Sequence, residues 1–471
     1  MSHHGDTETN RMLDQDRAQQ IFGKVKKFSS VAELEILFSS TDYSLTRFAN
    51  NTIHQNVSEL NEVASIRVAF DGKTARATTN RFDDESLKRA VQAAESMARV
   101  QDPDPERLPM ARPDEAPGAV AAPSRWFDST AAITPAHRAD AVGKIVAVAK
   151  KNGLVTAGIY SSSRHVEAII NSNGLSRYHR QTSAEVSITM LADDSSGWQK
   201  ANSPDVANVD PVLLGEVAAQ KARNSRHPRE LPPGKYTVIL EPAAVLDLVG
   251  FMFWDFGGMA ILDQRSFLNN RIGTKLFGEN ITIVDDVYHP LQSNTPFDGE
   301  GMPRQKVMLV ENGVVQKLVY ARGTAERMRK SEYAGAVGEI TVTGHGFPLP
   351  NEMGEAPVNI VFITPGNEQT VEQMVGGTER GILITRLWYI REVDPYEKIL
   401  TGMTRDGTFL VENGKVKGGI RNFRFNQSLI DMLNGVEAMG RAVRSSGEES
   451  FDMVAPAMKV RDFNFTEVTR F

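Results

Sequence analysis

The sequence contains no cysteine among its 471 residues. This absence excludes disulfide frameworks, thiolate zinc sites, iron–sulfur clusters and cysteine nucleophiles, because each of them needs a cysteine sulfur. Any bound metal would have to rely on histidine and carboxylate ligands. The nine histidines offer little for this purpose. No two of them have the helical spacing that would place both imidazoles on one zinc ion.

A strong excess of either charge is also missing, since 53 Lys and Arg residues against 59 Asp and Glu residues give a net charge of −6. The balance provides no general electrostatic reason to bind nucleic acid or an anionic membrane. The first ten residues lack the apolar core of a signal peptide. The most apolar stretch, Pro242–Leu262, contains two carboxylates that a bilayer helix would seldom carry unpaired. We therefore expect a buried segment there, a cytoplasmic protein, and neither nucleic acid nor membrane as a partner.

The glycine-rich nucleotide-binding motifs and the Gly-x-Ser-x-Gly nucleophile elbow are absent too. One acidic group with a nearby histidine remains, in which Asp285 and Asp286 end a strand shortly before His289. Such carboxylates can hold a hard cation, but aspartates at strand ends more often form turns. We favour the turn and expect no metal at this position.

The apolar stretch itself holds a second candidate site, because Asp247 and Asp255 lie about two helical turns apart in it. A carboxylate in so apolar a setting needs a partner or becomes protonated. The two residues therefore form a functional site, face a solvent-filled groove, or pair with Arg265 or Arg271.

The chain divides into segments at its proline-rich stretches. Six prolines between Asp102 and Pro123 favour an extended connector, and three prolines and a glycine follow between His227 and Gly234. We predict a disordered tail at 1–12, an N-terminal domain at 13–101, a Pro-rich linker at 102–124, a middle domain at 125–226 and a C-terminal domain at 227–471.

Helical and alternating patterns predict an α+β fold. The N-terminal and middle domains are expected to be α/β sandwich-like units, and the C-terminal domain a large antiparallel β-rich unit with a buried helix. Helices are predicted at Asp14–Lys27, Pro135–Lys151 and Pro211–Asn224, and short strands include Glu33–Ser39 and Tyr43–Ala49. The segments 309–315 and 410–416 repeat one pattern around an Asn-Gly pair, which we interpret as two independent hairpins with the same favoured turn.

Several segments resemble one known family. The stretches MVGGTERGILITRLWYIREVDPYEKILTG (374–402) and DGTFLVENGKVKGGIRNF (406–423) resemble the late signature of the TldD/PmbA family of zinc metallopeptidases and their inactivated homologues. LTRFANNTIHQNVSELNEVASIRV (45–68) and TTNRFDDESL (78–87) are similar to its first domain, and VEAIINSNG (166–174) to its middle domain. The resemblance covers nearly the whole chain.

The resemblance also implies what has been lost. Active members carry His-Glu-x-x-x-His on a helix, where both histidines bind zinc and the glutamate polarises water, and a cysteine near the C-terminus completes the metal site. The corresponding positions here are Leu246, Asp247 and Phe251, and no cysteine exists. The resemblance therefore implies no catalytic zinc in this chain, as in the PmbA/TldE-type members, with Asp255 as a possible residual acid.

Three functions follow from this resemblance. The first is a non-catalytic subunit that forms a heterodimer with a zinc-bearing TldD-type homologue and helps to degrade or process extended peptides. The second is an active metallopeptidase with an atypical metal site that uses Asp247 or Asp255. The third is a homodimeric peptide-binding module without chemistry.

The late signature also supplies candidates for peptide binding, because arginine and aromatic groups can hold an extended backbone and its carboxylates. The alternative is that they are core and turn-capping residues. The candidates are Arg380, Arg386, Trp388, Tyr389 and Arg391.

Overall fold

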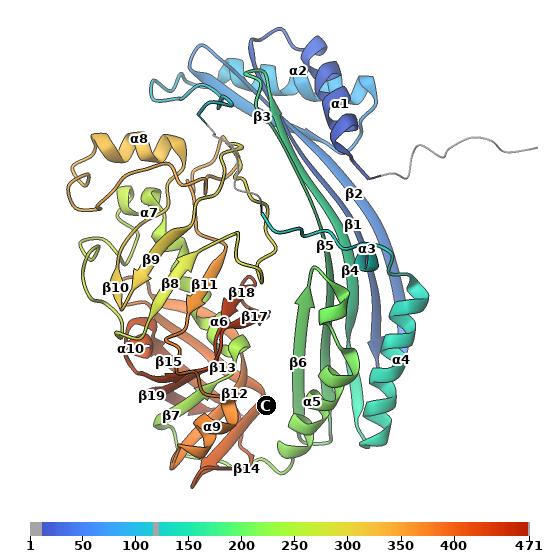
Figure 1. Cartoon of the computed structure of the whole chain (residues 1–471), viewed down its shortest axis with the longest axis vertical. Coiled ribbons are helices and arrows are strands. Elements are labelled where there is room, and N and C mark those ends of the chain that lie inside the picture. The colour runs from blue at the N-terminus through green and yellow to red at the C-terminus, as the bar shows by residue number, and fades with distance from the viewer. Residues whose placement is uncertain (1–11, 116–121, 470–471) are drawn as a thin grey trace, which may run out of the picture.

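The computed structural model describes residues 12–115 and 122–469 and divides them into two lobes (Figure 1). One lobe is a long curved sheet with helices on its outer face, and the other is the β-rich C-terminal region. The predicted α+β class with a β-rich C-terminal domain is confirmed. The predicted tail at 1–12 lies outside the described residues except for Met12.

A single antiparallel sheet carries the N-terminal and middle segments in the order β3-β2-β1-β4-β5-β6. Its strands are β1 (Glu33–Ala49), β2 (Thr52–Phe70), β3 (Lys73–Thr79), β4 (Val155–Asn171), β5 (Ser176–Leu191) and β6 (Ser196–Ser203). The pairing of β1 with β4 joins the two segments, so they share one sheet. Strand β1 spans both of the predicted strands Glu33–Ser39 and Tyr43–Ala49, because polar residues continue along it where one face stays half-exposed.

Side-chain alternation separates the two faces of this sheet. Most buried apolar residues of β1, β2, β4 and β5, such as Phe38, Ile66, Ala168 and Ile188, have even numbers and pack against helices; Ala69 and Ile169 are the odd-numbered exceptions. These helices are α1 (Gln15–Phe28), α2 (Asp84–Val100), α4 (Pro135–Lys151) and α5 (Pro211–Asn224); α3 (Asp128–Ala131) and the short 3₁₀ turn η1 (Val206–Asn208) lie between them in sequence. The N-caps of the four long helices are Asp14, Asp83, Thr134 and Asp210, whose side chains accept backbone N–H groups of the first turn.

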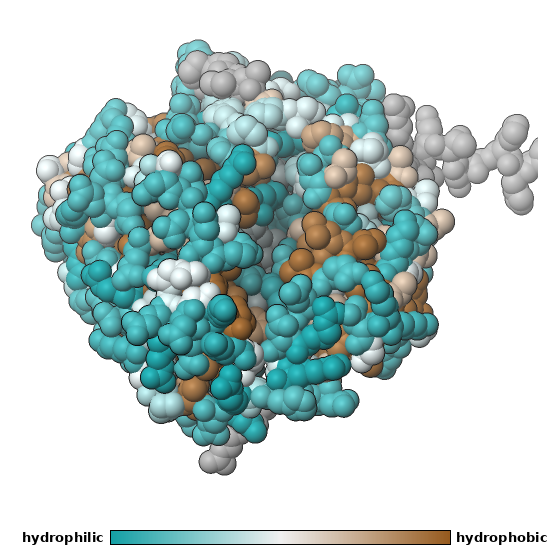
Figure 2. All heavy atoms as spheres, turned by 60° about the horizontal axis from the view of Figure 1, so that its bottom comes forward, coloured by the Kyte–Doolittle hydropathy of each residue, from teal (hydrophilic) through white to brown (hydrophobic). Residues whose placement is uncertain are grey.

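In β1, β2, β4 and β5 the odd-numbered side chains face the C-terminal lobe, and in β6 the even-numbered ones do. Arg177 of β5 donates to the carbonyl of Gly301, and Glu167 of β4 accepts from Thr295. In the space-filling view a furrow separates the two lobes on the face shown (Figure 2). The concave face of the sheet is therefore the wall that the C-terminal lobe faces.

A closed barrel forms one half of the C-terminal lobe. Its strands pair in the order β12-β7-β19-β15-β13, and β13 returns to β12. They are β7 (Gly234–Leu240), β12 (Arg380–Asp394), β13 (Ile399–Glu412), β15 (Phe423–Ser428) and β19 (Met458–Val468), with β14 (Lys415–Gly419) and β16 (Val436–Met439) attached. Closure of the barrel leaves these five strands without a free edge.

A second sheet of six strands lies beside the barrel in the order β10-β9-β8-β11-β18-β17. Its strands are β8 (Thr282–Asp285), β9 (Val307–Glu311), β10 (Val314–Val315), β11 (Ile360–Ile363), β17 (Val443–Ser445) and β18 (Met453–Ala455). The two repeated Asn-Gly turns form the expected hairpins, with positive φ at Asn312 and Asn413. One hairpin belongs to this sheet and the other to the barrel sheet, as expected for independent hairpins.

A buried helix, α6 (Pro242–Val249), contacts both β12 of the barrel and strands β17 and β18 of the second sheet. Residues Ala244–Val249 are fully buried, which confirms the expectation for the apolar stretch. The chain continues through η2 (Gly250–Phe256) and α7 (Gly258–Leu262); the later helices are α8 (Arg322–Lys330), α9 (Val371–Gly376) and α10 (Leu429–Asn434). In the described ranges, every helix is too short or too polar to cross a bilayer.

Candidate functional site

Helix α6 carries the acidic residue Asp247 into the interior, where the side chain has no exposed surface. Its Oδ1 accepts the backbone N–H groups of Glu448 and Glu449 at 3.1 and 3.0 Å. Its Oδ2 is buried and has no hydrogen-bond partner within the described residues. Burial raises the pKa of Asp247 to about 7 against the opposing effect of the two backbone N–H groups. Asp247 thus fastens the segment after β17 onto α6.

Glycine is required where this segment crosses the helix. A Cβ at Gly447 would lie 2.1 Å from Asp247 Oδ1 and 2.4 Å from Leu246 Cδ2. A Cβ at Gly250 would in turn lie 1.8 Å from the hydroxyl of Ser450. Residues 447–450 therefore lie directly against the helix, with no room for a larger side chain between them.

We expect Gly447→Ala to lower the free energy of unfolding by about 1–3 kcal/mol, because its methyl group overpacks the buried contact with Leu246 and Asp247. Urea unfolding of both proteins measures the change. Gly143→Ala is the matched control: Gly143 lies in helix α4 with nothing within 4 Å of its added Cβ. That substitution is expected to raise stability by about 0.5–1 kcal/mol. Equal stability of Gly447→Ala and the wild type would contradict the packing described.

Asp255, at the end of η2, forms an ion pair that the sequence did not indicate. Its Oδ2 lies 2.6 Å from Nζ of Lys398, which also lies 2.6 Å from Glu392. The alternative in which Asp247 or Asp255 pairs with Arg265 or Arg271 is wrong, because these arginines pair with Asp263 and Glu397 respectively. Burial raises the pKa of Asp255, and the Lys398 ammonium opposes this shift.

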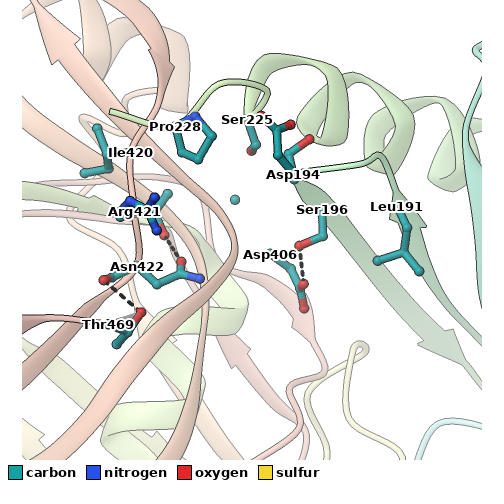
Figure 3. A pocket seen from close by; sticks show the side chains of 13 residues that line it. Leu191, Asp194, Ser196, Ser225, Pro228, Asp406, Ile420, Arg421, Asn422 and Thr469 are labelled. Atoms are coloured by element: carbon teal, nitrogen blue, oxygen red, sulfur yellow. Dashed lines mark hydrogen bonds between the residues drawn. The ribbon is translucent and has the colours of Figure 1, made fainter. Parts of the chain in front are cut away.

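Arg386 of β12 is 6% exposed and joins the two lobes. Its Nε donates to Asp406 Oδ2 of β13 at 2.9 Å, and the guanidinium lies 4.8 Å from the ring of Trp198 in β6 and 5.6 Å from that of Trp388. Figure 3 shows Ser196 of β6 donating to the other oxygen of the same carboxylate, at 2.6 Å, beside a pocket of about 300 Å³. Asp406 is thus one of the points at which the barrel contacts the long sheet.

The other candidates on β12 lie apart from this contact. Tyr389 is 54% exposed at a bulge with φ of +57°, and the guanidinium of Arg391 lies 4.6 Å from its ring. Glu449 accepts the backbone N–H of Tyr389 at 2.9 Å, so the segment held by Asp247 also holds this bulge. Arg380 lies at the opposite end of the strand. A role for these residues in peptide binding stays a prediction.

The acidic group at the end of β8 is structural. Asp285 is buried, accepts backbone N–H groups of Val358 and Asn359, and lies 3.0 Å from the ring of His345. Burial alone would raise the pKa of Asp285, but the His345 ring lowers it below its usual range. Asp286 accepts a turn N–H, as the favoured interpretation expects. Residues 12–115 and 122–469 hold no group of three or more His, Asp or Glu side chains arranged to bind a metal.

A groove of about 570 Å³ opens between the long sheet and the C-terminal lobe, close to η2. Glu167 of β4 lines one side, and Trp254, Arg304 and Phe451 line the other. Phe451 packs on Phe253 of η2 with ring centroids 6.3 Å apart, and Trp254 remains 45% exposed. The groove thus offers aromatic and charged side chains beside η2, the segment that follows the helix with Asp247.

Three family models match the chain. That of the PmbA/TldA metallopeptidase C-terminal domain matches residues 233–467, that of the central domain 123–226, and that of domain 1 34–98. The chain belongs to the TldD/PmbA family. This agrees with the resemblance seen in the sequence.

Individual relatives in the TldD/PmbA family are distant. Metalloprotease PmbA from Escherichia coli O157:H7 is 20% identical over 84% of each chain, and an uncharacterized protein from Methanocaldococcus jannaschii is 30% identical over 39% of this chain and 44% of its own. The crystal structure of TldE from Thermococcus kodakarensis is similar in fold, with a TM-score of 0.82, 20% identity, and coverage of 95% of this chain and 99% of that one.

Family membership raises the question of whether the residues here fit a zinc ion. Leu246 and Phe251 have no donor atoms. Asp247 is the one carboxylate at these positions, and its Oδ1 is already taken by two backbone N–H groups. A zinc site needs three or four donors around one point. The residues at the family's motif positions therefore do not fit the metal.

Sequence reasoning did not find the segment that covers this helix, nor the aromatic residues of the groove. Glu448 donates its backbone N–H group to Asp247, and the Glu449 carboxylate accepts the backbone N–H group of Tyr389. Neither contact has a recognisable sequence motif. Trp254 and Phe451 are almost two hundred positions apart in the sequence. Gly447 was the one available signal, since a glycine within a polar run marks a close approach.

Proposed function

We propose that this chain is a non-catalytic subunit of the TldD/PmbA family that acts in the cytoplasm. It pairs with a zinc-bearing TldD-type homologue, and together they degrade or process extended peptides. One observation carries the proposal. Leu246 and Phe251 are apolar, and the buried Asp247 already accepts backbone N–H groups, whereas hydrolysis by zinc needs metal ligands and a bound water at these positions.

The shape of the molecule supports a peptide as substrate. The face of the long sheet that is turned toward the C-terminal lobe presents half-exposed polar side chains, including Tyr43, His165 and Glu185. Across the groove beside η2, the C-terminal lobe adds Trp254 and Phe451 opposite this wall. An extended peptide can be held along such a surface by backbone hydrogen bonds and a few side-chain contacts.

The test compares the purified chain alone, a zinc-bearing homologue from the same genome alone, and a mixture of the two. We expect the chain alone to bind no stoichiometric zinc and to leave unfolded casein intact. The mixture is expected to elute as one complex and to hydrolyse casein faster than the homologue alone. Metal content is measured by mass spectrometry, association by size-exclusion chromatography, and hydrolysis by release of labelled peptide.

Other results would favour the two alternatives. Stoichiometric metal in the chain alone, together with casein hydrolysis that Asp247→Ala or Asp255→Ala removes, would favour an active enzyme with an atypical site. Binding of casein by a self-associated chain, without any complex or rate gain in the mixture, would favour a peptide-binding module. Failure of every tested homologue to associate would contradict the partner role.

A further inference from the structure

A cavity of about 260 Å³ lies on the helix-covered face of the long sheet. Residues of β1, β2 and β4 form its floor, and α3 with the start of α4 forms its side. Both helices lie along the outer side of the sheet (Figure 1). The cavity is therefore on the opposite face of the sheet from the groove beside η2, and the motif helix takes no part in it.

The sequence of β1 explains why a polar gap exists on this face. Phe38 packs in the apolar cluster around α1 and α2, and Phe48 packs in the cluster around α4 and α5. The even-numbered positions between them carry only polar residues, which are Ser40, Asp42, Ser44 and Thr46. Short polar side chains fill less of the space under the helices than large apolar ones do, which leaves a cavity lined by hydroxyl groups.

Arg138 of α4 lines this cavity and is 1% exposed. Its Nε donates to the hydroxyl of Thr46 and its Nη1 to that of Ser162, both at 3.3 Å. Among the residues that the structure describes, Nη2 has no hydrogen-bond acceptor and the guanidinium has no carboxylate partner. Burial accordingly lowers the pKa of Arg138. A buried cation without a counter-ion is costly, and an anion in the cavity would remove this cost.

The other charges of the lining leave this positive charge uncancelled. Asp42 and Arg164 also line the cavity, and they form an ion pair with each other. The lining as a whole therefore carries one net positive charge. Thr134 and Pro135, the N-cap and the first residue of α4, line it as well, so the positive end of the dipole of this 17-residue helix is directed at the cavity.

The arrangement of the donors indicates which kind of anion fits. The guanidinium comes from α4, the hydroxyl of Ser162 from β4, and those of Ser44 and Ser58 from β1 and β2. Ser44 and Ser58 share one hydrogen bond of 3.0 Å, so one of their two protons remains available. A tetrahedral oxyanion accepts hydrogen bonds from several directions, whereas a carboxylate offers two oxygens in one plane. Hydrogen phosphate also carries an O–H group that the Asp42 carboxylate can accept.

We propose that this cavity binds a phosphate group, with Arg138 as its charged partner and the hydroxyls of Ser58 and Ser162 as donors. The phosphate is either the free ion or part of a small monoester, since both present the same oxygens. Once bound, it connects α4 to three strands of the sheet and fills the polar gap. The inference goes beyond the proposed function and does not rest on it, because it involves neither the motif positions nor the peptide groove.

Isothermal titration calorimetry of the full-length chain with inorganic phosphate, in a HEPES buffer, tests the proposal. We expect saturable binding at one site with a Kd below about 1 mM, and binding of acetate that is at least tenfold weaker. Arg138→Gln is expected to weaken phosphate binding at least tenfold. O-phosphoserine distinguishes the two sources: tighter binding than that of inorganic phosphate assigns a monoester, and weaker binding assigns the free ion.

If Arg138→Gln does not fold, Ser58→Asp keeps the test decisive. Ser58 is exposed at the edge of the cavity, and a carboxylate there is expected to repel phosphate and weaken its binding at least tenfold. Asn61→Asp is the matched control, because it adds the same charge to an exposed position of β2 on the other face of the strand. It should bind phosphate as the wild type does.

Three results would overturn the proposal. They are the absence of saturable phosphate binding to the wild type, equal affinity for phosphate and acetate, and equal weakening of phosphate binding by Ser58→Asp and Asn61→Asp. None of these results bears on the pairing with a zinc-bearing homologue.

Discussion

We expect Asp247→Asn to lose much less stability than the wild type as the pH rises from 4 to 8. The pKa of Asp247 is raised from 3.8 to about 7 by burial. Between these two values the native protein keeps a proton that the unfolded chain has released, so the free energy of unfolding falls as pH rises. The contribution of Asp247 is fully present below the unfolded pKa and is lost as pH passes through 7.

The size of the effect follows from the same shift. A difference of about three pKa units corresponds to about 4 kcal/mol. Asparagine keeps the Oδ1 acceptor for the two backbone N–H groups of Glu448 and Glu449 but cannot ionise. Asp247→Asn is therefore expected to match the wild type near pH 4 and to exceed its stability by up to about 4 kcal/mol at pH 8.

Urea unfolding at several pH values measures this difference. Other buried carboxyls also have raised pKa values, among them those of Asp255, Asp298, Glu300 and Glu355, so only the difference between variant and wild type isolates Asp247. Asp193→Asn, at an exposed carboxylate, serves as the control and should leave the pH profile unchanged. Parallel profiles for Asp247→Asn and wild type would show that Asp247 is ionised in the native state at neutral pH.

Arg386→Ala is expected to cost about 3–5 kcal/mol of stability, because it leaves Asp406 buried without its main cationic partner. The substitution also removes the guanidinium that lies between Trp198 of the long sheet and Trp388 of the barrel. Arg386→Lys should recover part of the loss, since an ammonium restores the charge but not the planar contact.

Two measurements separate stability from the connection between lobes. Urea unfolding gives the free energy, and limited proteolysis reports on the connector and on the segment between the middle and C-terminal regions. Arg391→Ala is the matched control on the same strand, where the arginine contacts the exposed Tyr389, and we expect a change below about 1 kcal/mol. Similar losses for both variants would contradict the inter-lobe role of Arg386.

Local features of the fold were predictable from the sequence because they depend on neighbouring residues. The N-cap residues Asp83 and Asp210, the two Asn-Gly hairpins and the helix at Pro135–Lys151 all follow from interactions within a few positions. The length of β1 was not predictable in this way. The hydropathy of its central residues alternates only weakly, because one face borders a polar furrow. Pairing with the neighbouring strands keeps these residues extended.

The candidate site was predictable only in part. Family resemblance located positions 246, 247 and 251 on one helix. The structure buries Leu246 and Asp247 in α6, and it places the partly buried Phe251 in the following η2. The partners of the charged residues were beyond sequence reasoning. Lys398 reaches Asp255 across 143 positions, and Asp247 accepts N–H groups from residues about two hundred positions away.

By itself, the sequence determined what this protein lacks. It has no cysteine, and with Leu246 and Phe251 at the motif positions the family's zinc ligands are absent from those positions. Only the tertiary structure decided how the remaining charges are used. Asp247 fastens a loop, and Arg386 joins two lobes. The physical reason is that the presence of an atom is a property of composition, whereas burial and pairing depend on which distant segments the fold brings together.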